Sequence, residues 1–167
     1  MTTAPIMPLS RIEVPGGGTI GMMPCPGRSD SILAEVSKLK ELGVDVVVSL
    51  MQDQEFPDLA GFSEVMRSSA IEWIRLPVMP NSIPDEASDW KSVRFILIDR
   101  IADGKFVAIH CWGGLGRTGM IAADLLTALS YEPSEAITLV RDVRPGTIES
   151  EAQERWITRI QNPNVTS

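Results

Sequence analysis

The sequence predicts an α/β sandwich in which a central, mostly parallel sheet carries helices on both of its faces. Three observations support this fold class. Short apolar runs of strand length alternate with amphipathic segments of helix length, the Val-rich run 44–50 is typical of a strand buried on both faces, and the residues after 118 show only helical patterns. The 167 residues suffice for a single domain with one sizeable core.

Each predicted strand is a short run of apolar residues that is bounded by turn-forming residues. The first run is closed by the Pro and Gly residues of segment 24–27, and the last run leads directly into a glycine-rich segment. The predicted strands cover residues 19–23, 44–50, 71–78 and 105–110.

Each predicted helix shows apolar residues that recur at a spacing of three and four. Ser29 or Asp30 can cap the first helix and Gly43 can end it, while the turn at Pro145 and Gly146 separates the last two helices. The predicted helices cover residues 29–42, 85–101, 118–129, 133–143 and 150–160. Residues 1–18 are rich in Pro, Gly and Thr and predict a flexible N-terminal arm, so the folded domain is expected over residues 19–162.

The charge balance of the chain argues against polyanionic partners. The formal net charge is −7 and the isoelectric point is about 4.7, whereas nucleic-acid binding depends on Lys and Arg residues that neutralise phosphates. The sequence has no basic run, no apolar segment of the roughly 20 residues that span a bilayer, and no secretory signal pattern. We therefore expect a cytoplasmic monomer that binds neither nucleic acid nor membrane.

The cysteines and the single histidine exclude two further classes of site. Two cysteines, Cys25 and Cys111, do not make the dense framework of a disulfide-rich secreted domain. One histidine and two scattered cysteines also lack the usual ligand set of a zinc site. We expect neither a metal nor another cofactor.

The segment 110–119, which reads HCWGGLGRTG, is the strongest functional signal in the chain. A predicted strand ends here, Gly113, Gly114 and Gly116 follow, and a helix begins near Arg117. Glycines allow positive φ angles and let successive N–H groups converge on one point, and a helix N-terminus adds further unsatisfied N–H groups. The segment therefore predicts a cradle for a phosphate group.

Two side chains give this cradle a chemistry. Cys111 would lie at its base, and helix N-termini and neighbouring guanidinium groups favour the reactive thiolate form of a cysteine. Arg117 supplies a planar fork that matches two phosphate oxygens, and the hydroxyl of Thr118 can donate to the thiolate and favour its departure. A cysteine at the end of a buried strand is usually an inert small hydrophobe, but the glycines, the Arg-Thr pair and the strand-to-helix context favour phosphoryl transfer.

The segment HCWGGLGRTG resembles the signature His-Cys-x5-Arg-Ser/Thr of the cysteine-dependent protein tyrosine and dual-specificity phosphatase superfamily. The segments IGMMPCPGR, VDVVVSL and RPGTIESEAQ resemble the kinase-associated and small atypical dual-specificity members, and the likeness covers most of residues 18–161. The resemblance implies the three-layer sandwich of that superfamily. It also implies hydrolysis of phosphate monoesters, above all phosphotyrosine in proteins, through a phosphocysteine intermediate.

The resemblance assigns roles to individual residues. Cys111 would be the nucleophile, Arg117 would bind the phosphate, and Gln153 would orient the attacking water. The backbone of the loop would hold the phosphate oxygens, through Trp112, Gly113, Gly114, Leu115 and Gly116 as well as Arg117. Gln153 equally fits a capping box with Ser150 at the start of the last helix. His110 is expected to brace the loop by hydrogen bonding rather than to shuttle protons.

The chain departs from the family pattern at the general acid. Members of the superfamily protonate the leaving group with an Asp that follows the strand equivalent to 71–78, but Val78 and Pro80 occupy those positions here. Asp85 is the nearest carboxylate and is a candidate acid, although Ser82 and Asp85 also fit a capping box for the next helix, a role that we favour. Asp53 and Glu55 are weaker candidates.

The missing acid leads to an expectation about substrates. A positioned acid contributes about 10²–10⁴-fold to the rate. A phenolate leaves with little help, whereas the alkoxide of Ser or Thr does not, so aryl phosphates should be cleaved faster than phosphoserine or phosphothreonine.

Alternative functions remain open at this point. The chain could be a catalytically impaired adaptor that binds phosphate, or a phosphatase of a small non-protein phosphate ester, and its partner would be a phosphorylated protein or such an ester. The uncharged residues 112–116 and the acidic composition argue against phosphoinositides and RNA. Cys25 could form a reversible disulfide with oxidised Cys111, but we favour the interpretation that it is a turn residue without a partner.

Overall fold

The computed structural model describes residues 8–159, which fold around one five-stranded sheet with the strand order β1-β2-β5-β3-β4. The central strand β5 pairs in parallel with β2 and β3, β3 pairs in parallel with β4, and β1 alone runs antiparallel, beside β2. The strands are β1 (Ser10–Glu13), β2 (Thr19–Met23), β3 (Val46–Ser49), β4 (Glu72–Arg75) and β5 (Phe106–His110).

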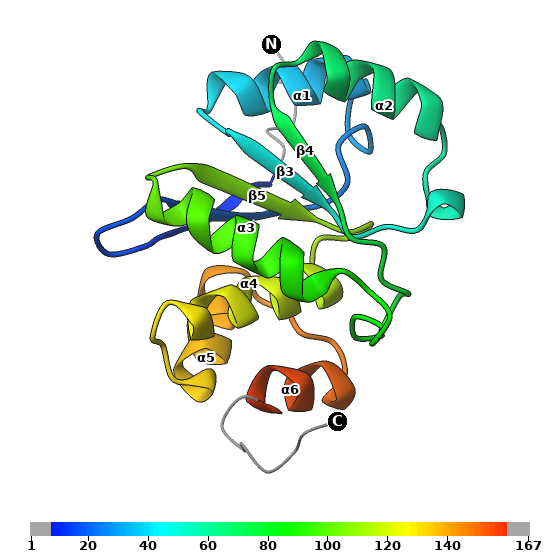
Figure 1. Cartoon of the computed structure of the whole chain (residues 1–167). Helices are drawn as coiled ribbons and strands as arrows, with labels where there is room; N and C mark the ends of the chain where they lie inside the picture. The colour runs from blue at the N-terminus through cyan, green and yellow to red at the C-terminus, as the bar shows by residue number, and fades with distance from the viewer. Residues whose placement is uncertain (1–7, 160–167) are drawn as a thin grey trace.

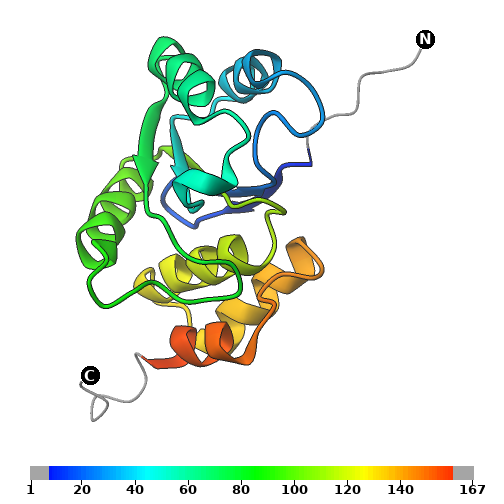
Figure 2. The same cartoon turned by 90° about the vertical axis from the view of Figure 1, so that its right-hand side faces the viewer.

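Within residues 8–159, six α-helices cover the two faces of the sheet and complete a three-layer sandwich (Figures 1 and 2). Helices α1 and α2 cover one face, and α3, α4, α5 and α6 lie on the other. The helices are α1 (Ile32–Glu41), α2 (Leu59–Ser68), α3 (Trp90–Ala102), α4 (Gly116–Ala128), α5 (Pro133–Val143) and α6 (Glu151–Thr158), and a short 3₁₀ turn, η1 (Asp53–Glu55), follows β3. None of the helices within residues 8–159 is long and apolar enough to cross a membrane.

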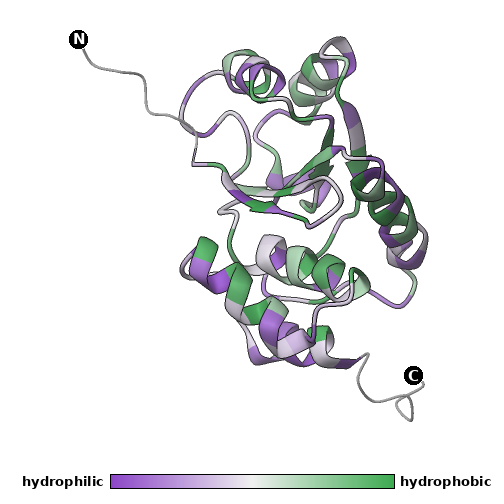
Figure 3. Ribbon diagram, turned by 90° about the vertical axis from the view of Figure 1, so that its left-hand side faces the viewer, coloured by the Kyte–Doolittle hydropathy of each residue, from purple (hydrophilic) through white to green (hydrophobic). Residues whose placement is uncertain are grey.

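The alternation of side chains along each strand builds a separate core on each face. Along β3, Val46 and Val48 pack toward α3 and α4, while Val47 packs toward α1 and α2. In β5, Val107 and Ile109 belong to the first core, and Ala108 belongs to the second. Figure 3 shows the hydrophobic residues along the strands and on the helix surfaces turned toward them. Because both faces are covered, the central strands are apolar throughout, as residues 44–50 predicted.

The topology places the glycine-rich segment at the centre of one sheet edge. The helices that follow β2 and β3 lie on one face of the sheet, while those that follow β4 and β5 lie on the other. The carboxyl end of β5 is therefore a switch point, where open α/β sheets place their ligand sites. Segment 110–119 leaves β5 at this point and enters α4.

The structure differs from the sequence predictions near the N-terminus and in the middle of the chain. Ser10–Glu13, predicted within a flexible arm, instead forms the edge strand β1, while residues 1–7 and the predicted domain end at 162 lie outside the described residues.

Helix α2 was not predicted, although Asp58 caps it and Phe62 and Met66 are buried along it. The N-cap of α1 is Ser31, whose hydroxyl accepts a hydrogen bond from the N–H of Ala34, rather than Ser29 or Asp30.

A buried carboxylate ties α4 to two neighbouring helices. Asp124 is fully buried in α4, and its two oxygens accept hydrogen bonds from Arg94 of α3 at 2.8 Å and from Arg159, beyond α6, at 2.9 Å. The two arginines are partly exposed, at 26% and 31%, so water stabilises the charges that a substitution at Asp124 would leave behind.

We expect Asp124→Ala to lower the free energy of unfolding by about 1.5–3 kcal/mol, the range for hydrogen bonds to charged groups. Urea denaturation of the variant and of Glu154→Ala, whose ion pair with Arg141 is exposed, would measure the difference. Equal stability of the two variants would show that the Asp124 network does not hold α3 and α6 to α4.

Candidate active site

Segment 110–119 forms a compact loop in which Cys111 and Thr118 meet. Cys111 follows β5 directly and is buried, with 4% of its surface exposed. Thr118, in the first turn of α4, donates its hydroxyl hydrogen to Cys111 Sγ across 3.1 Å. The structure thus brings together two of the residues that the sequence singled out.

The loop presents a row of unused backbone donors. Among the described residues, the N–H groups of 112–118 donate to no protein acceptor, and the first hydrogen bond of α4 runs from Gly119 N to Leu115 O. The N-cap residue Leu115 offers no side-chain acceptor. An uncapped helix N-terminus with converging N–H groups is a ready anion site.

The loop glycines act for different reasons, which the sequence did not separate. Gly114 has a φ of +71°, and a Cβ there would lie 2.3 Å from the carbonyl carbon and oxygen of Met23 at the end of β2. Gly116 has no positive φ, but a Cβ there would come within 3.1–3.3 Å of Glu149 and Gln153. Gly113 has neither constraint. Backbone conformation therefore requires glycine at position 114, and close packing favours it at 116.

Arg117 is held in place by a carboxylate that the sequence had presented as an acid candidate. Its Nη1 donates to Glu55 Oε2 and its Nη2 to Glu55 Oε1, each at 2.8 Å, and Nη1 also donates to Val78 O at 2.9 Å. Arg117 is 5% exposed. Within residues 8–159 its Nε–H and the second N–H of Nη2 have no acceptor, so one edge of the guanidinium is free to bind an anion.

The environment of Glu55 argues against a role as a proton donor. Burial alone would raise its pKa, but the hydrogen bonds from Arg117 and the backbone N–H of Gln52, together with the charge of Arg117, lower it overall. Glu55 is therefore an anion that orients Arg117. Asp53, the other candidate in this turn, pairs with Arg75 at 2.7 Å.

Asp85 lies in a turn ahead of α3 and not at its first residue. The helix starts at Trp90, so the predicted capping box of Ser82 and Asp85 is wrong. Asp85 Oδ1 instead accepts a hydrogen bond from Ala87 N at 2.9 Å, and the side chain is exposed. Within the described residues, the Asp85 side chain forms no hydrogen bond or ion pair with segment 110–119.

His110 is the centre of a buried hydrogen-bonded chain behind the loop. Its Nδ1 lies 3.1 Å from Cys111 O, and its Nε2 lies 2.5 Å from Ser49 Oγ, which also accepts from Trp73 Nε1 at 2.8 Å. Burial first, then the charges of Arg117 and Arg75, lower the pKa of His110 to about 4 although the carbonyl of Cys111 opposes this. The neutral ring must donate from Nδ1 to the carbonyl, so Ser49 donates to Nε2. This arrangement agrees with the predicted bracing role.

Gln153 is buried and occupied by structural hydrogen bonds. Its Oε1 accepts from Glu149 N at 3.0 Å and from Ser150 N at 3.3 Å, while Ser150 Oγ accepts from Gln153 N. This confirms the predicted capping box of α6. Its Nε2 donates to Ser82 O at 3.2 Å. The second Nε2 hydrogen has no recorded acceptor among the described residues.

Cys25 is a buried thiol in the turn after β2. Its Sγ donates to Pro26 O at 3.4 Å, and its N–H donates to Trp112 O at 3.1 Å. Burial, followed by the charge of Glu35, raises the pKa of Cys25 to about 12. A thiol that stays protonated attacks an oxidised cysteine slowly, which supports the structural interpretation of Cys25.

Cationic and apolar side chains border the loop despite the net negative charge of the chain. Arg28 donates to Trp112 O at 3.1 Å and stacks 4.5 Å from the centre of the Trp112 ring. Arg144 donates to Gly114 O at 2.7 Å and interacts electrostatically with Cys111, while burial lowers its own pKa. With Arg117, these residues form a local positive field at the loop.

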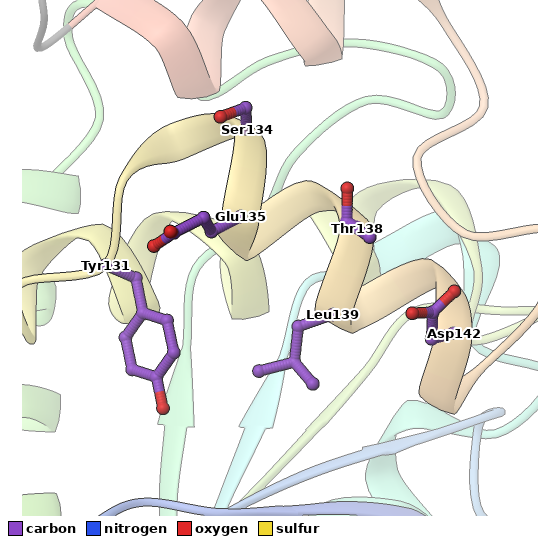
Figure 4. Close-up of a pocket in the computed structure, with 6 residues that line it drawn as sticks. All are labelled: Tyr131, Ser134, Glu135, Thr138, Leu139 and Asp142. Atoms are coloured by element: carbon purple, nitrogen blue, oxygen red, sulfur yellow. The ribbon is translucent and has the colours of Figure 1, made fainter.

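Two concavities show where ligands of different size could lie. A cavity of about 70 Å³ adjoins the loop and is lined by residues that include Cys25, Arg28, Phe56 and Trp112. An open depression of about 460 Å³ lies along α5 (Figure 4), and none of its lining residues belongs to segment 110–119: Tyr131, Ser134, Glu135, Thr138, Leu139 and Asp142. Within residues 8–159, no three His, Cys, Asp or Glu side chains are grouped as a metal site would require.

The fold, the cysteine at a strand end and the arginine at a helix start define the class of cysteine-based phosphatases. The family described as "PTP-SAK: Swiss Army Knife protein, DSP-PTPase phosphatase domain" matches residues 17–157. The chain belongs to this family, and it is a phosphatase of the tyrosine and dual-specificity class.

Individual relatives agree with the family assignment. Cyclin-dependent kinase inhibitor 3 of Rattus norvegicus is 29% identical over 164 residues, which cover 90% of this chain and 74% of the rat protein. Tyrosine-protein phosphatase CDC14 of Saccharomyces cerevisiae is 38% identical over 63 residues, or 37% of this chain and 11% of the yeast protein.

Solved structures share the fold. Kinase associated phosphatase, solved with its catalytic-site cysteine replaced by serine, superposes with a TM-score of 0.83 at 21% identity, over 96% of both chains. The active form of Tk-PTP has a TM-score of 0.67 at 26% identity and covers 87% of this chain and 92% of its own. These likenesses confirm the predicted three-layer sandwich.

The low pKa of His110 leads to a pH-dependent stability. The folded-state pKa of about 4 lies below the ordinary value of 6.5, so in this window the unfolded chain binds a proton that the folded chain does not. The stability that the neutral His110 contributes is complete above pH 6.5. This contribution is lost as the pH falls toward 4, so the free energy of unfolding decreases by at most about 3 kcal/mol.

NMR of the single imidazole should show a neutral Nδ1–H tautomer that titrates near pH 4. In His110→Asn, the free energy of unfolding should decrease less between pH 6.5 and 4.5 than it does in the wild type. A titration midpoint at the ordinary value, with the same loss of stability in the variant, would contradict the buried chain from Trp73 to Cys111.

Proposed function

We propose that the chain hydrolyses phosphate monoesters through a phosphocysteine formed on Cys111, with phosphotyrosine in proteins as the main substrate class. The observation that carries this proposal is the conjunction of Cys111 Sγ, the free N–H groups of 112–118 and the free edge of Arg117 in one loop. No metal takes part in the proposed steps.

Phosphate binding would use the backbone and the guanidinium together. The N–H groups of residues 112–117 and the Nε and Nη2 atoms of Arg117 donate to the nonbridging oxygens. Because Glu55 and Val78 O already hold the other donors of Arg117, the guanidinium needs no reorganisation when the phosphoryl group transfers. This rigid placement is worth more in a buried site than in water.

The cysteine would act twice. In the first step the thiolate of Cys111 attacks phosphorus and the ester oxygen leaves. In the second step water attacks the phosphocysteine, the P–S bond breaks, and inorganic phosphate leaves the loop. Thr118 donates to Sγ at 3.1 Å and so stabilises the thiolate that departs in this second step. Gln153 stays a predicted water-orienting residue, with one Nε2 hydrogen to offer.

Apolar side chains near the loop support an aromatic ester as substrate. Trp112 is 39% exposed, and Met79 and Ile83 are exposed on the segment whose carbonyls at Val78 and Ser82 bind Arg117 and Gln153. Aromatic rings pack well on such surfaces, and Arg28 offers a cation beside them. Phosphotyrosine combines the required phosphate with such a ring. The cytoplasmic location and the monomeric state stay predictions.

The basic test is hydrolysis of para-nitrophenyl phosphate in the presence of a chelator. We expect turnover that vanadate inhibits and that Cys111→Ser abolishes. An adaptor without activity would bind phosphate but show no turnover, and a small-ester phosphatase would prefer metabolites to phosphotyrosine peptides in a substrate panel.

The orientation of Arg117 provides a sharper prediction. We expect Glu55→Gln to lower kcat/KM by about 10²-fold, because a misplacement of about 1 Å costs this much. Arg117→Lys should lower kcat by about 10²–10³-fold, since a point charge replaces the bidentate fork. Both are measured with para-nitrophenyl phosphate.

Asp53→Asn is the matched control, because Asp53 lies in the same turn but pairs with Arg75. It should retain activity close to that of the wild type. A loss in Asp53→Asn as large as that in Glu55→Gln would show that the turn as a whole, and not the pair with Arg117, is required.

A further inference from the structure

The site still lacks a proton donor after the predicted candidates have been placed. Glu55 is bound to Arg117, Asp53 pairs with Arg75, and Asp85 accepts from Ala87 N in an exposed turn. A phosphatase without an acid would depend wholly on the leaving group. Proton donation would therefore need another carboxylate near the loop, one that is not already paired.

Glu149 is such a carboxylate. A Cβ placed on Gly116 would lie 3.1 Å from Glu149 Cδ and 3.3 Å from Glu149 Cβ, so the carboxyl group packs against the loop beside Arg117. Its backbone N–H donates to Gln153 Oε1, but within residues 8–159 its carboxylate takes part in no recorded hydrogen bond or ion pair. The side chain is exposed to solvent and is free to meet a substrate at the mouth of the loop.

The backbone before Glu149 is strained in a way that fixes this position. Ile148 has a φ of +61°, a conformation that a β-branched residue rarely adopts and that costs about 1–3 kcal/mol. Its N–H donates to Leu115 O in the loop at 3.3 Å, and Arg141 Nη2 donates to its carbonyl at 3.1 Å. The fold thus maintains an unfavourable conformation at the residue that precedes Glu149, as is common at functional sites.

The neighbouring contacts bring a second segment close to Glu149. Ser150 Oγ donates to Asn81 O at 3.2 Å, and Gln153 Nε2 donates to Ser82 O at 3.2 Å. The segment that normally carries the acid in the superfamily is therefore tied to the start of α6. Glu149 lies where this segment, the capping box of α6 and the loop meet.

We propose that Glu149 is the general acid and base of the reaction, a proposal that rests on the proposed nucleophilic role of Cys111. In the first step the thiolate attacks phosphorus, the P–O ester bond breaks, and the carboxyl group of Glu149 gives its proton to the leaving oxygen. In the second step the Glu149 carboxylate takes a proton from water as its oxygen attacks phosphorus and the P–S bond breaks. The net reaction converts one ester and one water into one alcohol or phenol and one inorganic phosphate.

This proposal changes the expectation drawn from the sequence. With Glu149 as acid, the enzyme depends less on the leaving group than the empty positions at Val78 and Pro80 suggest. Esters of poor leaving groups should then be cleaved with the help of Glu149, and this help should disappear when the proton donor is removed.

The test compares Glu149→Gln with the wild type on phenyl phosphate and para-nitrophenyl phosphate. We expect kcat/KM for phenyl phosphate to fall by about 10²–10⁴-fold, because phenolate, with a pKa of about 10, is the poorer of the two leaving groups and gains most from a proton donor. The loss on para-nitrophenyl phosphate should be much smaller, because nitrophenolate leaves unaided.

Two variants serve as controls for position and for charge. Glu151→Gln alters an exposed carboxylate in the first turn of α6 that pairs only with Arg155, and it should keep the wild-type ratio of the two rates. Asp85→Asn tests the rival acid directly. Vanadate affinity measured on each variant reports whether the loop is intact, and Glu149→Asp, which keeps a carboxyl group, should recover part of the activity on phenyl phosphate.

The outcomes separate this proposal from the one on which it rests. The role of Glu149 would be overturned if Glu149→Gln kept the wild-type ratio of the two rates, whether it lost no activity or lost it equally on both esters. A selective loss on phenyl phosphate in Asp85→Asn, and not in Glu149→Gln, would overturn it as well. Failure of the nucleophilic mechanism would instead appear as turnover of both esters by Cys111→Ser, whatever Glu149→Gln does.

Discussion

The contact between Arg117 and Glu55 holds together the ends of three parallel strands. Glu55 follows β3, Val78 follows β4, and Arg117 follows β5 by way of the loop. Burying a guanidinium without acceptors costs much desolvation free energy. The carboxylate of Glu55 and the carbonyl of Val78 therefore make the burial of Arg117 possible. The same contacts leave one edge of the guanidinium free. The anion site and the packing of the sheet edge therefore depend on one set of hydrogen bonds.

The acidic composition of the chain and its phosphate chemistry are compatible because the cations are local. Arg28, Arg117 and Arg144 surround the loop, and the first turn of α4 adds unpaired N–H groups. The neutral His110 behind Cys111 adds no charge of its own. Net charge governs long-range encounter, whereas a buried and preorganised site depends on its immediate neighbours.

The sequence predicted well those features that depend on local pattern. The strand, loop and helix around Cys111 were predicted because a short apolar run of strand length, a glycine-rich turn and an apolar helix follow each other without a gap. β1 was missed because an edge strand of four residues with Arg11 and Glu13 facing outward resembles a loop. Helix α2 was missed although its cap at Asp58 and its buried Phe62 and Met66 were visible at helical spacing.

Features that depend on contacts between distant residues were not predictable from spacing. Glu55 and Arg117 are 62 positions apart, and only the register of β3 beside β5 brings them together. Asp85 was interpreted by its distance from a predicted helix start, which the structure moves to Trp90. The position of Glu149 against Gly116 depends on the left-handed conformation of Ile148, and no propensity rule predicts that conformation for a β-branched residue.

The central claim is that Cys111 forms a covalent bond to phosphorus during turnover. Rapid acid quenching of the wild-type enzyme with an aryl phosphate, followed by peptide mass spectrometry, tests it most directly. The account predicts a phosphate on the peptide that contains Cys111, attached to sulfur, in an amount that rises to a steady level during turnover. Turnover with no phosphorylated peptide, or with the phosphate on a different residue, would contradict it.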